Sequence, residues 1–225
     1  MTDPRHVGAY GIAETAHYLA LPPATLRAWV RGRPYPTAEG RQFSEPLIQL
    51  PEPAEPLLSF TNLVEAHVLK AIRRRHGIPM QKVRPALLYL EEELGVAHPL
   101  AHQELLTDGV HLFVEHFGRV VNLSRPDQLY LRGVLEAHLR RIEHDAEGLA
   151  LRLFPFSRGE ALDVPRIVVV DPRISFGRPV IAGTSVRTEV IASRLKAGES
   201  VQDLADDYSV EVAEVEEAIR YELAA

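Results

Sequence analysis

Two short helical patterns open the chain. Apolar residues between Ile12 and Ala20 recur at intervals of three or four positions, which predicts an amphipathic helix that ends before the pair Pro22-Pro23. Leu26 and Val30 lie four positions apart and predict a second short helix. The stretch Arg41–Ser44 is then typical of a strand. The beginning of the chain is therefore predicted to form a helix, a turn, a second helix and a wing.

The next segment combines a proline-rich connector with two more helical patterns. Four prolines lie between Pro46 and Pro56, which predicts an extended connector. The apolar spacing over residues 62–75 predicts a helix. A second apolar stripe runs from Met80 to Leu94 in steps of three and four. Pro85 lies within that stripe, so the helix either kinks there or begins near Arg84.

Strands and a long helix are predicted in the middle of the chain. Apolar residues cluster over 109–122, with Gly118 as a plausible turn, and this indicates a β-hairpin. Ser124 and Asp127 form a variant of the capping box, which predicts a helix from there to about Glu147.

The composition changes around residues 155–165, where we place the last domain boundary. The run Ile167–Val170 is β-branched throughout and predicts a strand. Three short helices are predicted after it: one that ends at Gly198, one capped by Ser200, and one over Glu211–Leu223. We therefore expect a mainly α protein with three regions: a winged helix-turn-helix over 1–76, a connecting region with a helix and a β-hairpin over 77–160, and three helices behind a short strand over 161–225.

Charge is distributed unevenly along the chain. The 225 residues contain 25 basic and 31 acidic side chains, which gives a net charge of −6. Residues 24–43 carry four arginines and one glutamate, whereas residues 199–222 carry nine acids and one arginine. The two ends are therefore expected to meet different partners. The chain has no cysteine, no apolar run long enough to cross a bilayer and no signal-peptide pattern, so we expect a cytoplasmic protein without disulfides.

The basic cluster near the start predicts a DNA-binding surface. A second helix that carries polar and basic side chains on its exposed face is how a helix-turn-helix presents donors to DNA, and arginines on a wing would reach phosphates beside it. The alternative is an arginine cluster that binds a protein. The candidate DNA-binding residues are Thr25, Arg27, Arg31, Arg33 and Arg41.

This constellation resembles the MerR-type winged helix-turn-helix. The resemblance rests on Ala13-Glu14 in the first helix, Leu26-Arg27-x-Trp29 in the second, and Arg41-Gln42-Phe43-Ser44 in the wing. It covers roughly residues 10–75 and implies binding to operator DNA. A dimer is then expected, because such proteins read paired half-sites about one helical turn apart.

The last third of the chain resembles the antitoxin-type domain of unknown function 433. The motifs are Asp171-Pro172-Arg173-Ile174, the string from Gly177 to Thr184, Ala197-Gly198-Glu199-Ser200, and the pattern from Val215 to Tyr221. The resemblance implies a homeodomain-like fold of three helices and, in the manner of VapB-type antitoxins, a PIN-like ribonuclease toxin as partner. The candidate toxin-binding residues in this part of the chain are Arg173, Arg178, Arg187, Glu211, Glu214 and Tyr221.

The acidic last helix is unsuited to DNA, because each of its carboxylates would meet a polyanion. An acidic unit fits a basic protein surface better, although a solvated acidic face on a dimerisation domain is the alternative. We find no HExxH, no phosphate-binding glycine loop and no third ligand beside His98 and His102. We therefore expect no enzyme, metal or cofactor.

These patterns together predict an antitoxin of a type II toxin–antitoxin pair that binds and inhibits a PIN-like ribonuclease and represses its own operon. The alternative is a MerR-like transcriptional regulator without a toxin, in which residues 77–165 hold a small ligand.

Overall fold

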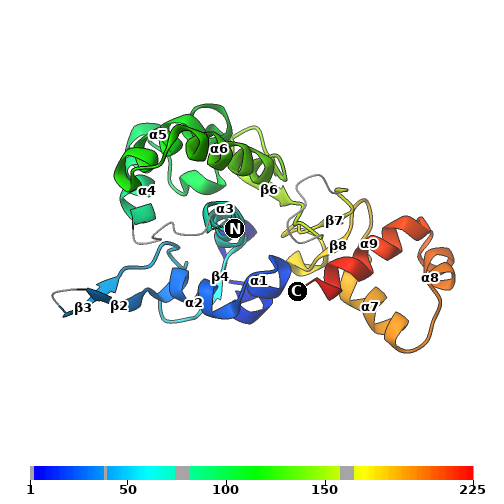
Figure 1. Ribbon diagram of the computed structural model, residues 1–225. Coiled ribbons are helices and arrows are strands. Elements are labelled where there is room, and N and C mark those ends of the chain that lie inside the picture. The colour runs from blue at the N-terminus through cyan, green and yellow to red at the C-terminus, as the bar shows by residue number, and fades with distance from the viewer. Residues whose placement is uncertain (1–2, 38–39, 74–81, 158–164, 225) are drawn as a thin grey trace.

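The computed structural model describes residues 3–37, 40–73, 82–157 and 165–224. Helices dominate this part of the chain, and its strands form small antiparallel pairs, so the predicted mainly α fold is confirmed. Figure 1 shows three parts: a wing and two short helices at one side, helices α4 to α6 above them, and helices α7 to α9 at the other end.

The amino-terminal part contains the predicted helix-turn-helix and wing. Pro23 occupies the first turn of α2, where a missing N–H costs nothing, and Gly32 follows the end of that helix. Strands β2 and β3 pair directly and form the wing, as predicted. The elements are η1 (Pro4–His6), β1 (Tyr10–Gly11), α1 (Ile12–Tyr18), α2 (Pro23–Arg31), β2 (Arg33–Thr37), β3 (Gly40–Ser44) and β4 (Leu57–Leu58).

Helix α3 lies at the centre of the molecule. Nearly all of its side chains are buried, because η1, β4, η3 and α6 pack around it. Of the two possibilities at Pro85, a kink or a helix that begins near Arg84, the second is confirmed, because Pro85 lies in the first turn of α4. The elements of this region are α3 (Phe60–Arg73), α4 (Val83–Leu94), η3 (Pro99–Ala101), η4 (Leu105–Gly109), α5 (Val110–Val121), α6 (Arg125–Leu139), β5 (Ile142–His144) and β6 (Ala150–Leu153).

Two predictions for the middle region are wrong. Residues 110–121 form helix α5 instead of strands, because Val110, Phe113, Val114 and Phe117 share one helical face that is buried. The predicted turn at Gly118 is a close helix contact, where a Cβ would lie 2.9 Å from the Gln128 side chain.

The helix predicted to reach Glu147 ends at Leu139. The chain then forms the hairpin β5–β6, whose turn includes Gly148 at a φ of +80°. The middle region therefore does contain a β-hairpin, but it lies over 142–153 instead of 109–122.

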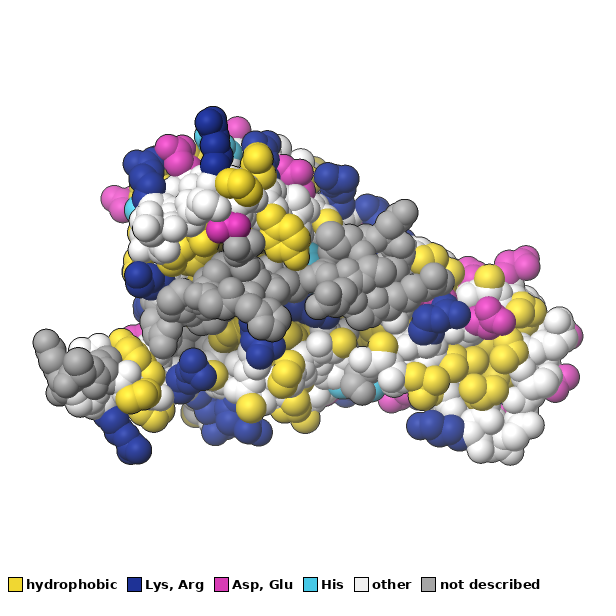
Figure 2. Space-filling view, viewed as in Figure 1, with side chains coloured by type: hydrophobic (Ala, Val, Ile, Leu, Met, Phe, Trp, Pro, Cys, Tyr) yellow, Lys and Arg dark blue, Asp and Glu magenta, His cyan; other side chains and the backbone are white. Residues whose placement is uncertain are grey.

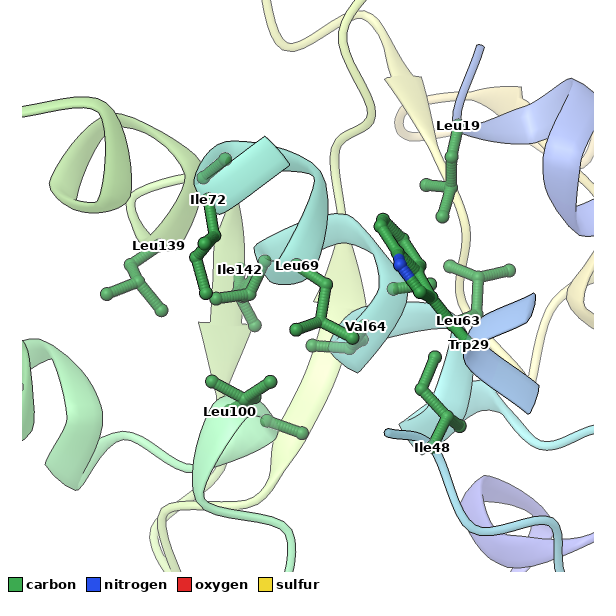
Figure 3. Close-up of a cluster of buried hydrophobic side chains, with 14 of the residues drawn as sticks. Leu19, Trp29, Ile48, Leu63, Val64, Leu69, Ile72, Leu100, Leu139 and Ile142 are labelled. Atoms are coloured by element: carbon green, nitrogen blue, oxygen red, sulfur yellow. The ribbon is translucent and has the colours of Figure 1, made fainter. Parts of the chain in front are cut away.

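A single cluster of buried side chains joins the amino-terminal and middle regions. It extends from Tyr10 to Leu153 and also includes Val170. Figure 3 shows Trp29 and Ile48 on one side of α3, near Leu63, with Leu139 and Ile142 on its other side. The second helix of the helix-turn-helix is therefore fixed to the central helix by direct packing.

The carboxy-terminal region has its own small core, formed by Ile181, Ile191, Leu204, Val215 and Ala218 among others. The short strand and the three helices behind it are present as predicted. Ser200 accepts a hydrogen bond from the backbone N–H of Asp203, so the predicted cap is confirmed. The elements are β7 (Val168–Val169), η5 (Ser175–Gly177), β8 (Val180–Ile181), α7 (Thr188–Lys196), α8 (Val201–Tyr208) and α9 (Val212–Leu223).

Polar contacts connect the carboxy-terminal region to α1. Tyr221 Oη donates a hydrogen bond to the Tyr18 carbonyl at 3.0 Å, and Arg178 Nη1 donates to Tyr18 Oη at 3.1 Å. Arg178 also pairs with Glu14. The carboxy-terminal end therefore lies beside α1 (Figure 1). Among the described residues, no helix has the length and apolar character needed to cross a membrane.

Candidate functional site

The exposed face of α2 is basic and its other face is apolar. Leu26, Trp29 and Val30 are buried, whereas Arg27 and Arg31 are exposed and Thr25 is half-buried. Local hydrogen bonds also hold the helix, because the backbone N–H groups of Leu47 and Ile48 both donate to the Trp29 carbonyl, at 2.7 and 3.1 Å. The chain after the wing therefore fixes the carboxy-terminal end of α2.

The two candidate arginines of the wing lie on opposite faces of the hairpin. Arg33 pairs with Ser44 and Arg41 pairs with Pro36 across the strands. Directly paired residues share a face and successive residues alternate, so Arg33 and Arg41 project to opposite sides. The structure therefore groups Thr25, Arg27 and Arg31 on one helix and separates the remaining two arginines.

The charges of these arginines are not neutralised within the described part of the chain. Arg27, Arg31, Arg33 and Arg41 are all exposed, and no ion pair or side-chain hydrogen bond to them is present among the described residues. Figure 2 shows dark-blue side chains around α2 and the wing. Exposed guanidinium groups without a partner are suited to bind phosphate oxygens, often with two parallel hydrogen bonds.

Two of the candidate toxin-binding residues contact α1. Tyr221 is 3% exposed, and its hydroxyl group bonds to the Tyr18 carbonyl. Burial raises the pKa of Tyr221 well above its usual value, so this hydroxyl stays protonated as a donor. Arg178 is occupied by Glu14 and Tyr18. Both residues hold the carboxy-terminal region against α1.

Arg173 is held by a buried carboxylate. Its Nε and Nη2 donate to Asp171 at 3.0 and 2.8 Å, and Arg152 Nε donates to the same carboxylate at 3.0 Å. Burial raises the pKa of Asp171, but the hydrogen bonds from Arg173 and Arg152 outweigh this effect and the pKa is lowered. Asp171 is therefore a charged anchor for the loop that precedes η5.

The remaining candidates lie at two separate places. Arg187 precedes α7 and pairs with Glu189 at 3.0 Å on the surface. Glu211 and Glu214 form a capping box at the start of α9, where Glu214 accepts a hydrogen bond from the Glu211 N–H at 2.9 Å. That end lies about 15 Å along the helix axis from Tyr221. The six residues therefore do not form one patch.

The sequence analysis missed Phe176, the most exposed large apolar side chain among the described residues, at 95%. Ser175, Phe176 and Gly177 have φ angles of +48°, +56° and +75°, a left-handed run that is uncommon for residues other than glycine. A Cβ on Gly177 would lie 2.0 Å from Tyr10 Oη, so only glycine permits this close contact. The contact between Gly177 and Tyr10 therefore fixes the backbone of the loop, while the ring of Phe176 faces solvent.

The only signal for this feature in the sequence is an aromatic residue between Ser175 and Gly177 in a loop rich in Gly and Pro. Within the described ranges, no group of three or more His, Cys, Asp or Glu side chains is placed to bind a metal.

Comparison with known proteins confirms the two predicted resemblances at the level of domains. Residues 8–87 match the family described as "Putative DNA-binding HTH domain", and residues 168–221 match "Protein of unknown function (DUF433)". The chain is 35% identical to "Putative antitoxin VapB45" from Mycobacterium tuberculosis, over 95% of this chain and 93% of the relative.

A second relative and a crystal structure come from the same organism. The chain is 26% identical to "Uncharacterized protein Rv2308", over 94% of this chain and 89% of that protein. The crystal structure of Rv2018 superimposes with a TM-score of 0.68 at 32% identity, over 95% of this chain and 98% of that one. The similarity therefore extends over nearly the whole chain and includes the middle region.

Proposed function

The chain belongs to the family of the putative antitoxin VapB45, and from this membership we propose that it is an antitoxin of a type II toxin–antitoxin pair that represses its own operon. The observation that carries the DNA-binding part of the proposal is the set of exposed arginines on α2 and the wing, which have no partner among the described residues and lie within a helix-turn-helix domain. Such residues supply the phosphate and base contacts of operator binding.

In this proposal α2 enters the major groove with Arg27 and Arg31 facing the DNA. The wing lies beside it, and its two arginines, on opposite faces of the hairpin, contact phosphates of the two strands that border one groove. A homodimer would place two copies of α2 about one helical turn apart on a paired operator.

The carboxy-terminal region is proposed to bind and inhibit a PIN-like ribonuclease toxin. Its surface offers Phe176 as an exposed aromatic residue on a fixed loop. Ser175 Oγ in the same loop donates a hydrogen bond to the Ser185 carbonyl at 3.1 Å, and Arg187 follows two residues after Ser185. Aromatic residues that need no ordering on binding are the usual anchors of protein interfaces. Glu211 and Glu214 would contribute a separate contact at the far end of α9.

The DNA-binding part is tested with Arg27→Ala and a matched control. Arg132→Ala removes an exposed arginine from α6 that pairs with Glu136 at 2.8 Å, far along the chain from the helix-turn-helix. Fluorescence anisotropy with labelled DNA from the protein's own promoter should show a loss of about 1–3 kcal/mol for Arg27→Ala if the side chain reads a base, and little change for Arg132→Ala. Equal affinity of both variants and the wild type would contradict the assignment of α2.

The toxin-binding part is tested with Phe176→Ala. The full chain is produced together with the product of the adjacent gene, and ribonuclease activity is measured after co-purification. Phe176→Ala should release an active ribonuclease, whereas Leu129→Ala, which removes a side chain that is 66% exposed on α6, should leave it bound and inactive. If Phe176→Ala inhibits as well as the wild type, the loop is not the contact.

A further inference from the structure

A cavity of about 180 Å³, partly open to solvent beside Leu88 and Glu91, lies between α3, α4, η3 and the segment 47–49 that follows the wing. Its apolar wall is formed by Leu47, Leu87, Leu88 and Leu100. An apolar cavity of about 150 Å³ in another protein accommodates benzene. The space is therefore suited to a molecule of about six to ten non-hydrogen atoms.

The Glu65 carboxylate forms a polar part of the cavity wall and is held in place by hydrogen bonds. Glu65 accepts hydrogen bonds from His98 Nδ1 and from Asn62 Nδ2, each at 2.9 Å, so both carboxylate oxygens are occupied. The hydrogen bond with Glu65 raises the pKa of His98 against the opposing effect of burial. His98 also has a left-handed backbone, with a φ of +57°, and the pairing with Glu65 fixes its ring in this position.

Two further charged groups line the cavity and retain capacity for a ligand. Arg84 donates through Nη1 to the Pro46 carbonyl, and its other N–H groups have no partner in the described part of the chain. No hydrogen bond or ion pair to the Glu91 carboxylate occurs among the described residues. The two residues lie seven positions apart on α4, on the same face, with Leu87 and Leu88 between them.

We propose that this cavity binds a small zwitterion with a branched apolar group, of the α-amino acid class. The leucine side chains would surround the apolar group, Arg84 would bind the carboxylate, and Glu91 would bind the ammonium group. A carboxylate ligand without an amino group would leave the Glu91 charge beside it unpaired, and an amine without a carboxylate would leave Arg84 unused.

The cavity wall is also part of the support for α2. Leu47 lines the cavity, and the N–H groups of Leu47 and Ile48 hold the Trp29 carbonyl. Occupation of the cavity would therefore act on the segment that positions the DNA-reading helix. The proposed ligand site does not depend on a toxin partner, so it would serve equally in a transcriptional regulator that responds to a ligand.

The test is isothermal titration calorimetry of the full chain with three molecules that share a branched isobutyl group. L-Leucine should bind with one site per chain and a Kd between about 1 µM and 1 mM. 4-Methylpentanoate, which lacks the amino group, and 3-methylbutylamine, which lacks the carboxylate, should each bind at least about tenfold more weakly. No saturable binding of leucine up to about 10 mM, or equal binding of either analogue, overturns the proposal.

The site is located with Glu91→Gln, and Glu92→Gln serves as its control. Glu92 is exposed on the same helix and does not line the cavity. Glu91→Gln should weaken leucine binding about tenfold, because it removes the charge that contacts the ammonium group. It should not weaken 4-methylpentanoate binding, because that molecule has no ammonium group and its carboxylate would no longer lie beside the Glu91 charge. Glu92→Gln should match the wild type for both molecules. If Glu91→Gln binds leucine as tightly as Glu92→Gln does, the ligand lies elsewhere and the proposal fails.

Discussion

Replacement of Gly32 by alanine should disrupt the junction between α2 and the wing. Gly32 has φ +71° and ψ 179°, a region of backbone conformation that essentially only glycine adopts. A Cβ at this position would lie 2.3 Å from the Ser44 carbonyl oxygen and 2.7 Å from the ring of Phe43. The carbonyl belongs to the backbone of β3, so it cannot move without a shift of the wing.

The expected loss can be estimated by comparison with a second glycine. The conformation at Gly32 should cost alanine about 1–3 kcal/mol, before the clash with Ser44 is counted. Gly133 lies on the exposed face of α6, and a Cβ there would meet nothing within 4 Å. Gly133→Ala should therefore stabilise the protein by about 0.5–1 kcal/mol. The two variants should differ by about 1.5–4 kcal/mol in the free energy of unfolding.

The measurement is unfolding in denaturant, followed by fluorescence of Trp29. Trp29 is the single tryptophan, it is buried, and it lies on α2 three residues before Gly32. Gly32→Ala should lower the midpoint and weaken promoter binding in the same preparation, because the wing carries Arg33 and Arg41. If Gly32→Ala is as stable as Gly133→Ala and binds DNA like the wild type, the strained turn has been assigned wrongly.

Two other predictions concern the interior. Tyr221→Phe should lower the free energy of unfolding by about 0.5–1.5 kcal/mol, because the Tyr18 carbonyl loses its hydrogen-bond donor. Tyr130 is exposed, so Tyr130→Phe should change this free energy little. Calorimetric unfolding of the two variants distinguishes the two outcomes. Burial and the neighbouring His138 keep the pKa of His67 well below 6.5, so the unfolded chain takes up a proton that the folded chain excludes. Stability should therefore fall as the pH drops below about 6.5, and His67→Gln should flatten this slope in unfolding curves between about pH 5 and 7.

Local signals in the sequence were sufficient to predict both ends of the molecule. The pair Pro22-Pro23 separates α1 from α2, and Ser200 with Asp203 starts α8, because each of these residues acts within one turn of its own helix. The exposed arginines Arg27 and Arg31 were also identified, since the exposed face of α2 follows directly from the positions of Leu26 and Val30.

Contacts between distant residues decided the parts that the sequence patterns predicted wrongly. Helix α6 ends at Leu139, and Arg141 is buried in the turn that leads from this helix to β5. Its Nε donates to the Phe154 carbonyl at 2.8 Å, and its Nη2 donates to the carbonyls of Pro155 and Pro165 at 3.1 Å each. Burial lowers the pKa of Arg141 to about 10. These partners lie 13 to 24 residues away, so no helical pattern around residue 141 could indicate them.

The same limit applies to the candidate toxin-binding residues. Arg178 and Tyr221 come from motifs confined to the carboxy-terminal region, yet both contact α1, 160 and 203 residues away in the sequence. Phe176 shows the opposite case, because it is exposed although the next residue, Gly177, lies in close contact with Tyr10. Neither outcome follows from local periodicity, since each depends on how two regions of the chain meet.

These contacts also determine which experiments can separate the two proposed activities. Removal of residues 166–225 would strip Tyr18 of both Arg178 and Tyr221, and Leu153 of its backbone pairing with Val170. Val170 belongs to the same buried cluster as Trp29, so the truncation would expose apolar surface beside the helix-turn-helix. Loss of DNA binding by such a fragment would therefore follow from damage to the core as readily as from loss of a binding surface. Single substitutions at Arg27 and Phe176 alter exposed side chains and leave this junction intact, so a selective loss of one activity can be attributed to the residue that was changed.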